Sequence, residues 1–376
     1  MEQFDLSSAP TTWFPRKDTT MSVESIPQHV VVVGGGIVGA SIAWHLSQDT
    51  NVTVIAEQVG GVATPNSFAW INAVSGDPQY YYNFRDRSVK RWKEISEELP
   101  DLPVHWGGGL NWSLDPEELQ AYLDKYAGWG SDIIRVDHST IAELEPNIQD
   151  SSIPEWGVYV SEEGAVEAHI AARQLITHAE AKGAQLVETT ATGFIKTDGR
   201  ISGVVTAAGE IQADHVVVAA GVGSVDLLAT ENVALPVTSK EGILVNSRPT
   251  KTKLANSVVY TKDLHLRQTL DGRIRAGAEV EEEDPQEVAE AVFALVRKTL
   301  KHSEKLKLDY YTVGYRPYPE DGLPILGSTG LDGLTIATMH SGVTNAAIVG
   351  ELLSKQILTG ESDPALSDFR LDRFKE

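Results

Sequence analysis

The sequence predicts an α/β fold with two domains, one built on a parallel sheet that the chain enters repeatedly and one built on an antiparallel sheet with helices. Residues 30–33 are four consecutive valines that run directly into glycine, a pattern typical of a parallel strand buried on both faces. Residues 215–219 form a second valine-rich strand that also ends at glycine. Between them, Asp-Gly and Ala-Gly turns at residues 198–199 and 208–209 predict an antiparallel meander.

Length, composition and charge agree with this fold class and exclude several partners. The chain has 376 residues, of which 41% are hydrophobic and 22% charged, as expected for a globular protein of one large or two medium domains. A net charge of -22 argues against nucleic acid or an anionic membrane surface as a partner. No apolar run reaches the roughly 18 residues of a membrane-spanning helix, so we expect no transmembrane segment.

The chain contains no cysteine and no recognisable targeting signal. The absence of cysteine excludes disulfides, thiolate metal sites and a thiol nucleophile, and no His, Asp and Glu cluster has the spacing of metal ligands. Residues 1–25 lack the apolar segment and cationic start of a secretory signal. We therefore expect a flexible N-terminal arm and an intracellular, cytoplasmic location.

A glycine triplet after the first valine strand predicts a dinucleotide site. Gly34, Gly36 and Gly39 have the spacing that allows a sharp turn, a close approach of backbone to a pyrophosphate, and tight helix packing. The helix predicted at residues 37–48 has no acidic side chain in its first turn, so its N-terminus is free to receive an anion.

The second strand, residues 51–56, ends at Glu57, whose carboxylate can accept both hydroxyls of an adenosine ribose. A glycine-rich turn in an ordinary α/β protein is the alternative to a dinucleotide site. The order of strand, triplet, helix, strand and acid within about 30 residues favours the dinucleotide.

The next part of the chain predicts a loop and several capped helices. Residues 58–73 read as a loop, and residues 80–99 as a helix with an aromatic stripe inward and Arg85 among the basic residues largely on the other side. After a strand within residues 105–114, Asp115 begins a helix with a capping box, and Ser139 is predicted to cap a short one.

The rest of the chain alternates helices and strands. Gly183 is expected to end the helix at residues 168–182 as a left-handed cap. The further elements are strands at 157–160, 185–189, 193–196, 201–206 and 333–338, strand-like pattern from 236 to 278, helices at 284–303 and 341–357, and a turn-rich loop at 314–327.

With its C-terminal segment included, the chain resembles the flavoprotein family of D-amino-acid oxidases, glycine oxidase and the sarcosine oxidases. The resemblance covers about residues 29 to 372. It depends on the glycine triplet with Glu57, Val166-Glu167 before the middle helix, Ala219-Ala220-Gly221, Gly314-Tyr315-Arg316-Pro317 with Asp321-Gly322-Leu323-Pro324, and His340-Ser341-Gly342. Each segment is common alone, and their order makes the set specific.

The resemblance implies a Rossmann-like FAD-binding domain, discontinuous in sequence, and a substrate domain of antiparallel sheet and helices. The implied FAD-binding domain comprises residues 26–77, 155–232 and 318–376. The implied substrate domain comprises residues 78–154 and 233–317. Because the chain has neither the histidine nor the cysteine to which some relatives attach the flavin, FAD is expected to be non-covalent.

The resemblance also assigns FAD contacts residue by residue. They fall on Gly34, Gly36, Ile37, Gly39, Glu57, Gln58, Thr64, Pro65, Ala69, Trp70, Ile71, Thr192, Gly221, Ser341, Gly342, Val343 and Thr344. The last four open a helix, and a helix N-terminus directed at the flavin stabilises negative charge developing there.

Arg316 matches the arginine with which the family binds a substrate carboxylate, and a planar fork of donors suits that role. A surface arginine on a turn is the alternative. Tyr260 and His265 are candidates to orient or deprotonate the amine, against a packed tyrosine and a surface histidine. Arg275 lies where sarcosine-oxidising relatives carry a lysine that assists oxygen, and a structural ion pair is its alternative. His340 is expected to support the flavin loop.

The implied reaction is oxidation of the CH–NH bond of an amino acid or secondary amine by hydride transfer to the flavin, giving an imine that hydrolyses. The expected partners are this small molecule and oxygen or another electron acceptor. An NAD-dependent dehydrogenase and a non-catalytic flavin-binding module stay as alternatives. Substrate identity, chirality and oligomeric state are left open.

Overall fold

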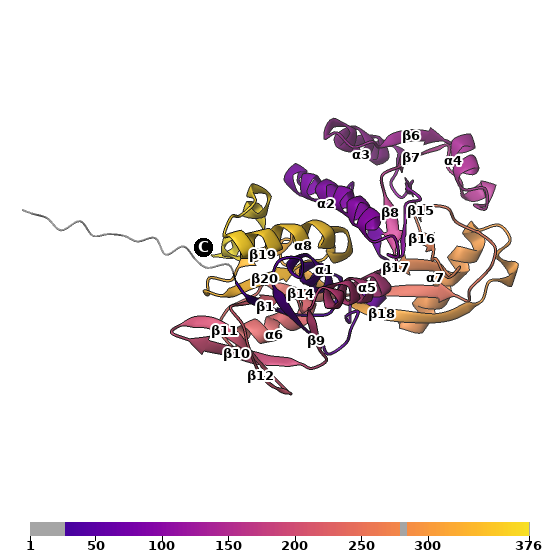
Figure 1. Ribbon diagram of the computed structural model, residues 1–376. Coiled ribbons are helices and arrows are strands. Elements are labelled where there is room, and N and C mark those ends of the chain that lie inside the picture. The colour runs from indigo at the N-terminus through magenta and orange to yellow at the C-terminus, as the bar shows by residue number, and fades with distance from the viewer. Residues whose placement is uncertain (1–26, 279–283, 376) are drawn as a thin grey trace, which may run out of the picture.

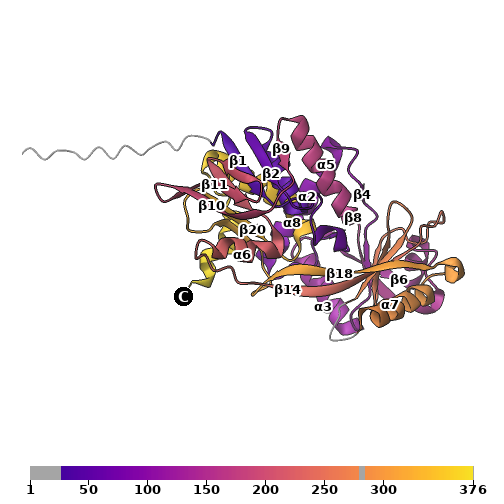
Figure 2. The ribbon, with the colours of Figure 1, turned by 90° about the horizontal axis from the view of Figure 1, so that it is seen from below.

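The computed structural model describes residues 27–278 and 284–375, which fold into two parts (Figures 1 and 2). The long strands β14 and β18 run from one part to the other (Figure 2). The expected N-terminal arm, residues 1–25, lies outside the described residues.

The first part is built on a six-stranded sheet whose central strands are parallel. Its order is β19 (Ile325–Ser328), β20 (Leu334–Thr338), β13 (His215–Val218), β1 (His29–Val33), β2 (Asn51–Ile55) and β9 (Gln185–Val187), and β19 alone among these is antiparallel to its neighbour. Val30 to Val33 are all buried. The α/β fold class and the strand buried on both faces are therefore confirmed.

Alternate valines of β1 face two different cores. Val30 and Val32 belong to the core beneath a layer of helices, in which α1 (Ile37–Leu46) lies between α5 (Ala168–Ala181) and α8 (Gly342–Thr359). Val31 and Val33 contact the core on the opposite face. That face is covered by the predicted meander, with strands β10 (Ala191–Thr197), β11 (Arg200–Thr206) and β12 (Gly209–Gln212), and by the short helix α6 (Ser224–Ala229).

The second part is built on an eight-stranded, largely antiparallel sheet. Its order is β18 (Leu308–Pro319), β14 (Val237–Ser247), β17 (Ile274–Ala278), β16 (His265–Gln268), β15 (Val258–Tyr260), β5 (Gly109–Asn111), β7 (Trp156–Val160) and β6 (Ile134–Asp137). Only β15 and β5 pair in parallel in this sheet as described. Helix α7 (Pro285–Thr299) packs against β14, β17 and β18, and α3 (Pro116–Gly128) and α4 (His138–Leu144) lie beside β6 and β7.

A small sheet and a long helix join the two parts. The sheet has the order β3 (Trp70–Ile71), β8 (Gly164–Val166) and β4 (Val104–His105). Helix α2 (Gln79–Glu98) packs along α8, where the indole of Trp92 donates to the carbonyl of Val343 at 2.9 Å. The small sheet and helix α2 thus bring residues of both parts close together.

Several elements differ from the sequence-based expectation. Residues 314–319 belong to the long strand β18 and not to a loop. Asp137, not Ser139, caps α4, because its carboxylate accepts from the Thr140 amide at 2.8 Å. The capping box of Asp115 with Glu118 is confirmed.

The structure also bears on the expected domain boundaries. β7 pairs with β5 and β6, although residues 155–160 were expected in the FAD-binding domain, and α2 contacts α8, although it was expected in the other domain. In the described part of the chain, no helix combines the length and apolar character that a membrane crossing requires.

Candidate active site

The carboxyl ends of four parallel strands open on one large cavity of about 1090 Å³. Residues after β1, β2, β13 and β20 form one wall, and β14, β15, β16 and β18 of the eight-stranded sheet form the other. Ligands of open α/β sheets bind at such strand ends, so the topology alone marks this cavity as the candidate site.

At one end of the cavity, the glycine triplet does what its spacing predicts. A Cβ on Gly34, whose φ is +125°, would lie 2.3 Å from the carbonyl oxygen of Ala219. A Cβ on Gly36 would lie 3.1 Å from the hydroxyl of Thr64 across the cavity wall. Gly39 does not line the cavity. Its missing side chain lets α1 pack closely on β1, because a Cβ there would lie 2.0 Å from the Gly34 oxygen.

Helix α1 begins at this glycine cradle with its positive end exposed to the cavity. It has no side-chain cap and no acidic residue in its first turn. The Ile37 amide donates to the Thr64 hydroxyl at 3.1 Å, which holds the facing loop close to the helix start. Backbone donors on glycine at a helix N-terminus suit a pyrophosphate, so the chain fits the expected dinucleotide.

Most of the other expected cofactor contacts also reach the cavity. Those that line it are Glu57, Gln58, Thr64, Ala69, Trp70, Gly221, Ser341, Gly342, Val343 and Thr344. Pro65, Ile71 and Thr192 do not line it. Ile71 is fully buried behind the wall, and Thr192 is exposed on β10 while its neighbours Thr190 and Ala191 face the cavity.

The N-terminus of α8 also opens on the cavity that Glu57 lines. Ser341 is its N-cap without a side-chain cap bond, and its first turn holds no acid. The Thr344 hydroxyl donates to the Trp70 carbonyl at 3.0 Å, so the helix start is fixed to strand β3. The start of α8 lies close to that of α1, because a Cβ on Gly342 would be 3.2 Å from the Val38 side chain. Two positive helix ends thus open on one cavity, which fits a ligand with two electron-rich regions.

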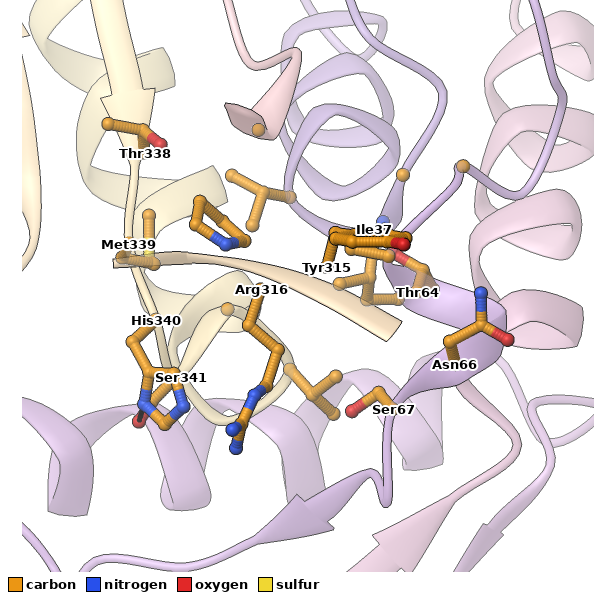
Figure 3. A pocket seen from close by; sticks show the side chains of 18 of the residues that line it. Ile37, Thr64, Asn66, Ser67, Tyr315, Arg316, Thr338, Met339, His340 and Ser341 are labelled. Atoms are coloured by element: carbon orange, nitrogen blue, oxygen red, sulfur yellow. Dashed lines mark hydrogen bonds between the residues drawn. The ribbon is translucent and has the colours of Figure 1, made fainter. Parts of the chain in front are cut away.

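Arg316 lies at the α8 end, on β18. Its side chain lies over Gly242 of β14, where an added Cβ would be 3.1 Å from the guanidinium carbon, and it donates to the Glu241 carbonyl at 2.8 Å. It reaches into the space between His340 and Ser67 (Figure 3). The position is compatible with binding a substrate carboxylate inside the cavity.

Two histidines face this end of the cavity as neutral side chains. Burial, with a smaller contribution from the charge of Arg316, lowers the pKa of His265 to about 4. Burial, with Arg316, Arg85 and Lys240, also lowers the pKa of His340 to about 4. The ring of His340 lines the cavity, and its centroid lies 5.1 Å from that of Tyr318 with the two planes tilted by 55°. Both imidazoles are therefore neutral at neutral pH, and each has a ring nitrogen that can accept a hydrogen bond.

His265 and Tyr260 come together as sequence reasoning expected. They face each other on the paired strands β15 and β16, with ring centroids 5.7 Å apart, and both line the cavity. Phe68 contacts His265 edge-on at 4.4 Å. Gly277 leaves the space for this imidazole, because a Cβ there would lie 2.1 Å from Nε2.

Arg275 does not line the cavity. It lies 3.6 Å from the carboxylate of Glu167, which also pairs with Arg267 at 2.7 Å, and all three side chains are buried. Its Nε donates to the Asn246 side chain at 2.9 Å. The geometry corresponds to the structural ion pair that was the alternative to an oxygen-assisting role.

Sequence reasoning missed Arg85 as a cavity residue. It was expected on the outer side of its helix, and the structure buries it with its guanidinium against Ser341. Its position one turn after Tyr81 and one turn before Val89 places it within the buried stripe, and this spacing is the signal that pointed inward.

Comparison with known families and proteins agrees with this geometry. The family described as FAD dependent oxidoreductase (DAO) matches residues 29–356. The glycine oxidase of Bacillus subtilis is 26% identical over 369 residues, covering 91% of this chain and 96% of that protein.

A bifunctional protein and a solved structure extend the comparison. The bifunctional protein ThiO/ThiG of Trichormus variabilis is 27% identical over 380 residues, and the match covers 92% of this chain but only 55% of that protein. The crystal structure of glycine oxidase from Geobacillus kaustophilus has a TM-score of 0.82 at 22% identity, covering 93% of this chain and 99% of that one.

Proposed function

The chain belongs to the family of FAD-dependent oxidoreductases, and we propose that it oxidises the CH–NH bond of an amino acid or secondary amine to an imine. The observation that carries the proposal is that one cavity is lined both by a dinucleotide cradle and by Arg316 beside two neutral histidines. The names of the relatives, which include glycine oxidase, support this substrate class.

The residues that would hold FAD without a covalent bond are the glycine cradle, Glu57, the loop at residues 64–70 and the start of α8. When bound, the flavin supplies the hydride acceptor that no protein side chain provides. The protein contributes orientation and a cavity from which water can be excluded.

Arg316 binds the carboxylate of the substrate in this proposal. A guanidinium fork donates two parallel hydrogen bonds to a carboxylate, and Gly242 beneath it keeps the side chain flat against β14. The carboxylate thereby fixes where the neighbouring carbon and nitrogen lie.

His265 and Tyr260 are proposed to receive the amine. A neutral imidazole accepts a hydrogen bond from an N–H of the neutral amine and so orients the nitrogen whose lone pair forms the carbon–nitrogen double bond. The burial that keeps His265 and His340 uncharged, together with the nearby cations, also disfavours an ammonium there, so both effects lower the pKa of the bound substrate amine. Water that enters after oxidation hydrolyses the imine.

The test is anaerobic reduction of the purified protein. We expect a yellow protein with about one FAD per chain whose visible absorbance bleaches under argon with one or more D-, L- or N-methyl amino acids. A colourless protein that reduces NAD in solution would instead support a nicotinamide dehydrogenase, and a yellow protein that no amine bleaches would support a binding module. The rate of recolouring on admitting air then tests oxygen as the acceptor.

A further inference from the structure

Arg85 is a deeply buried cation at the α8 end of the cavity. Only 3% of the residue is exposed. Its Nε donates to the Asn72 carbonyl at 3.1 Å, one terminal nitrogen donates to the Ser341 hydroxyl at 2.9 Å, and the other donates to the Asn72 side chain. A guanidinium has five N–H groups, so these three bonds leave two N–H groups for another acceptor. Arg85 lines the cavity, where a ligand could supply that acceptor.

No acid neutralises this charge. Within the described ranges, no carboxylate oxygen lies within the 4.0 Å limit of an ion pair with Arg85, and its three hydrogen-bond acceptors are neutral. By contrast, the buried Arg267 and Arg275 share Glu167. A cation buried without a counter-ion is costly, which suggests that a ligand supplies the negative charge.

Glu163 is the acid that comes nearest to compensating Arg85, and it is itself buried. Burial raises the pKa of Glu163 to about 8, against smaller lowering effects of Arg85 and Trp70. At neutral pH this carboxyl is largely protonated, so the positive charge of Arg85 persists.

The start of α8 adds to the same field. Ser341, which accepts from Arg85, is the N-cap of this 18-residue helix, and its hydroxyl does not cap the helix. The uncapped end carries a partial positive charge of about +0.5. A guanidinium and a helix N-terminus that meet in a cavity recognise an edge rich in carbonyl oxygens on which negative charge resides.

The ligand that fits is the redox ring of the cofactor. The glycine cradle and Glu57 account for the pyrophosphate and ribose, so the ring is left for the part of the cavity that Arg85 and the start of α8 line. A hydride carries two electrons and one proton, so its loss leaves the substrate as an iminium cation, and the group that accepts it gains one negative charge.

We infer that Arg85 and the first turn of α8 form the seat of the flavin's carbonyl-bearing edge, and that Arg85 raises the reduction potential of the bound flavin by stabilising this added charge. The role rests on the proposed function. Asn72 and Ser341 hold the guanidinium in place.

The experiment compares the holoenzyme with Arg85→Met, Arg85→Lys and the matched control Arg87→Met. Arg87 lies on the same helix, but its side chain is 41% exposed and pairs with Asp363 at 3.1 Å. The readouts, taken without substrate, are the midpoint potential of the flavin and its affinity for sulfite, which binds more tightly when negative charge on the ring is stabilised. Arg85→Gln, a neutral donor, replaces Arg85→Met if that variant does not retain flavin.

We expect Arg85→Met to weaken sulfite binding at least roughly tenfold and to lower the potential correspondingly, by about 30 mV for a two-electron couple. Arg85→Lys should keep most of the wild-type value and Arg87→Met all of it. An unchanged potential and an unchanged sulfite affinity in the neutral variant would overturn the role of Arg85. A colourless wild-type protein would refute the proposed function itself, which separates the two failures.

Discussion

At the scale of single residues, the cavity depends on cations placed beside glycines. Arg316 lies flat because Gly242 has no side chain, and Arg85 turns inward toward Ser341. Together with Lys240, which lies 3.6 Å above the ring of Tyr318, they concentrate positive charge around His340. The arginine proposed to bind the substrate carboxylate thus also helps to keep His340 neutral.

The first prediction concerns Arg316. In Arg316→Met we expect kcat/KM for a carboxylate substrate to fall roughly 10- to 150-fold, mainly through KM, because a hydrogen bond to a charged group contributes about 1.5–3 kcal/mol. Arg316→Lys should lose part of this effect, since lysine keeps the charge without the fork. Steady-state kinetics measure both variants.

The control is the amine that corresponds to the substrate without its carboxylate. Its turnover, however slow in the wild type, should be the same in Arg316→Met. An equal loss for both compounds would mean that Arg316 does not act on the carboxylate.

The second prediction concerns His215 of β13, whose Nε2 lies 2.9 Å from the Thr335 hydroxyl on β20. Burial, with a smaller effect of Arg200, lowers its pKa to about 4. The unfolded chain binds the proton at about pH 6.5, so the stability due to neutral His215 is complete above pH 6.5 and is lost as pH falls toward 4.

Urea unfolding between pH 7.5 and 4.5 measures this effect. The free energy of unfolding of the wild type should fall relative to that of His215→Gln by up to about 1.4 kcal/mol per pH unit in this window. The exposed His302→Asn serves as the control and should follow the wild type. Parallel curves for His215→Gln and the wild type would contradict the prediction.

At the scale of elements, the sequence predicted the helices and strands that depend on interactions between residues close together in the chain. The helices after Gly36 and Asp115 and the strand of valines at 30–33 were expected where they occur. The C-terminal half of strand β18 was expected to be a loop, because Pro317 and Pro319 are typical of loops. These prolines are tolerated since β18 is the edge of its sheet, where an absent N–H costs no ladder bond.

The third prediction tests the packing of α1 on β1. Gly39→Ala places a methyl group 2.0 Å from the Gly34 oxygen, so the helix must move away from the strand and the cradle must open. We expect a loss of about 1–3 kcal/mol of stability, as in other overpacked sites, together with loss of bound FAD. Thermal unfolding and the ratio of flavin to protein absorbance report the two effects.

Gly128→Ala is the matched control. Gly128 lies in α3 with nothing within 4 Å of an added Cβ, so alanine should stabilise the protein by about 0.5–1 kcal/mol and leave FAD content unchanged. If Gly39→Ala behaves like Gly128→Ala, the tight contact of helix and strand is not required.

At the scale of the whole molecule, the cavity depends on contacts that no local pattern contains. The parallel sheet takes β1 and β2 from the start of the chain, β13 from the middle and β20 from near the end. The resemblance to a flavoprotein family implied, before the structure was considered, that these distant segments form one domain. The spacing of Arg85 placed it on the buried side of its helix, but its bond to Ser341 and the removal of Arg275 from the cavity depend on tertiary packing that spacing does not contain.

The last prediction concerns the buried ion pairs between the two parts. Glu167 begins α5 of the first part, and Arg267 and Arg275 come from β16 and β17 of the second. Arg267 also donates to the Phe68 carbonyl at 2.8 Å in the loop that lines the cavity. Glu167→Gln keeps the shape but leaves two buried guanidinium groups without a counter-ion, so we expect a loss of about 3–5 kcal/mol of stability.

Urea unfolding followed by tryptophan and flavin fluorescence measures this loss, and release of flavin before global unfolding would locate it at the junction. The control is Lys90→Met, which removes the exposed pair of Lys90 with Asp86 and should change stability by less than about 1 kcal/mol. If Glu167→Gln also stays within 1 kcal/mol of the wild type, the two parts are joined by apolar packing, and the buried charges then contribute no net stability.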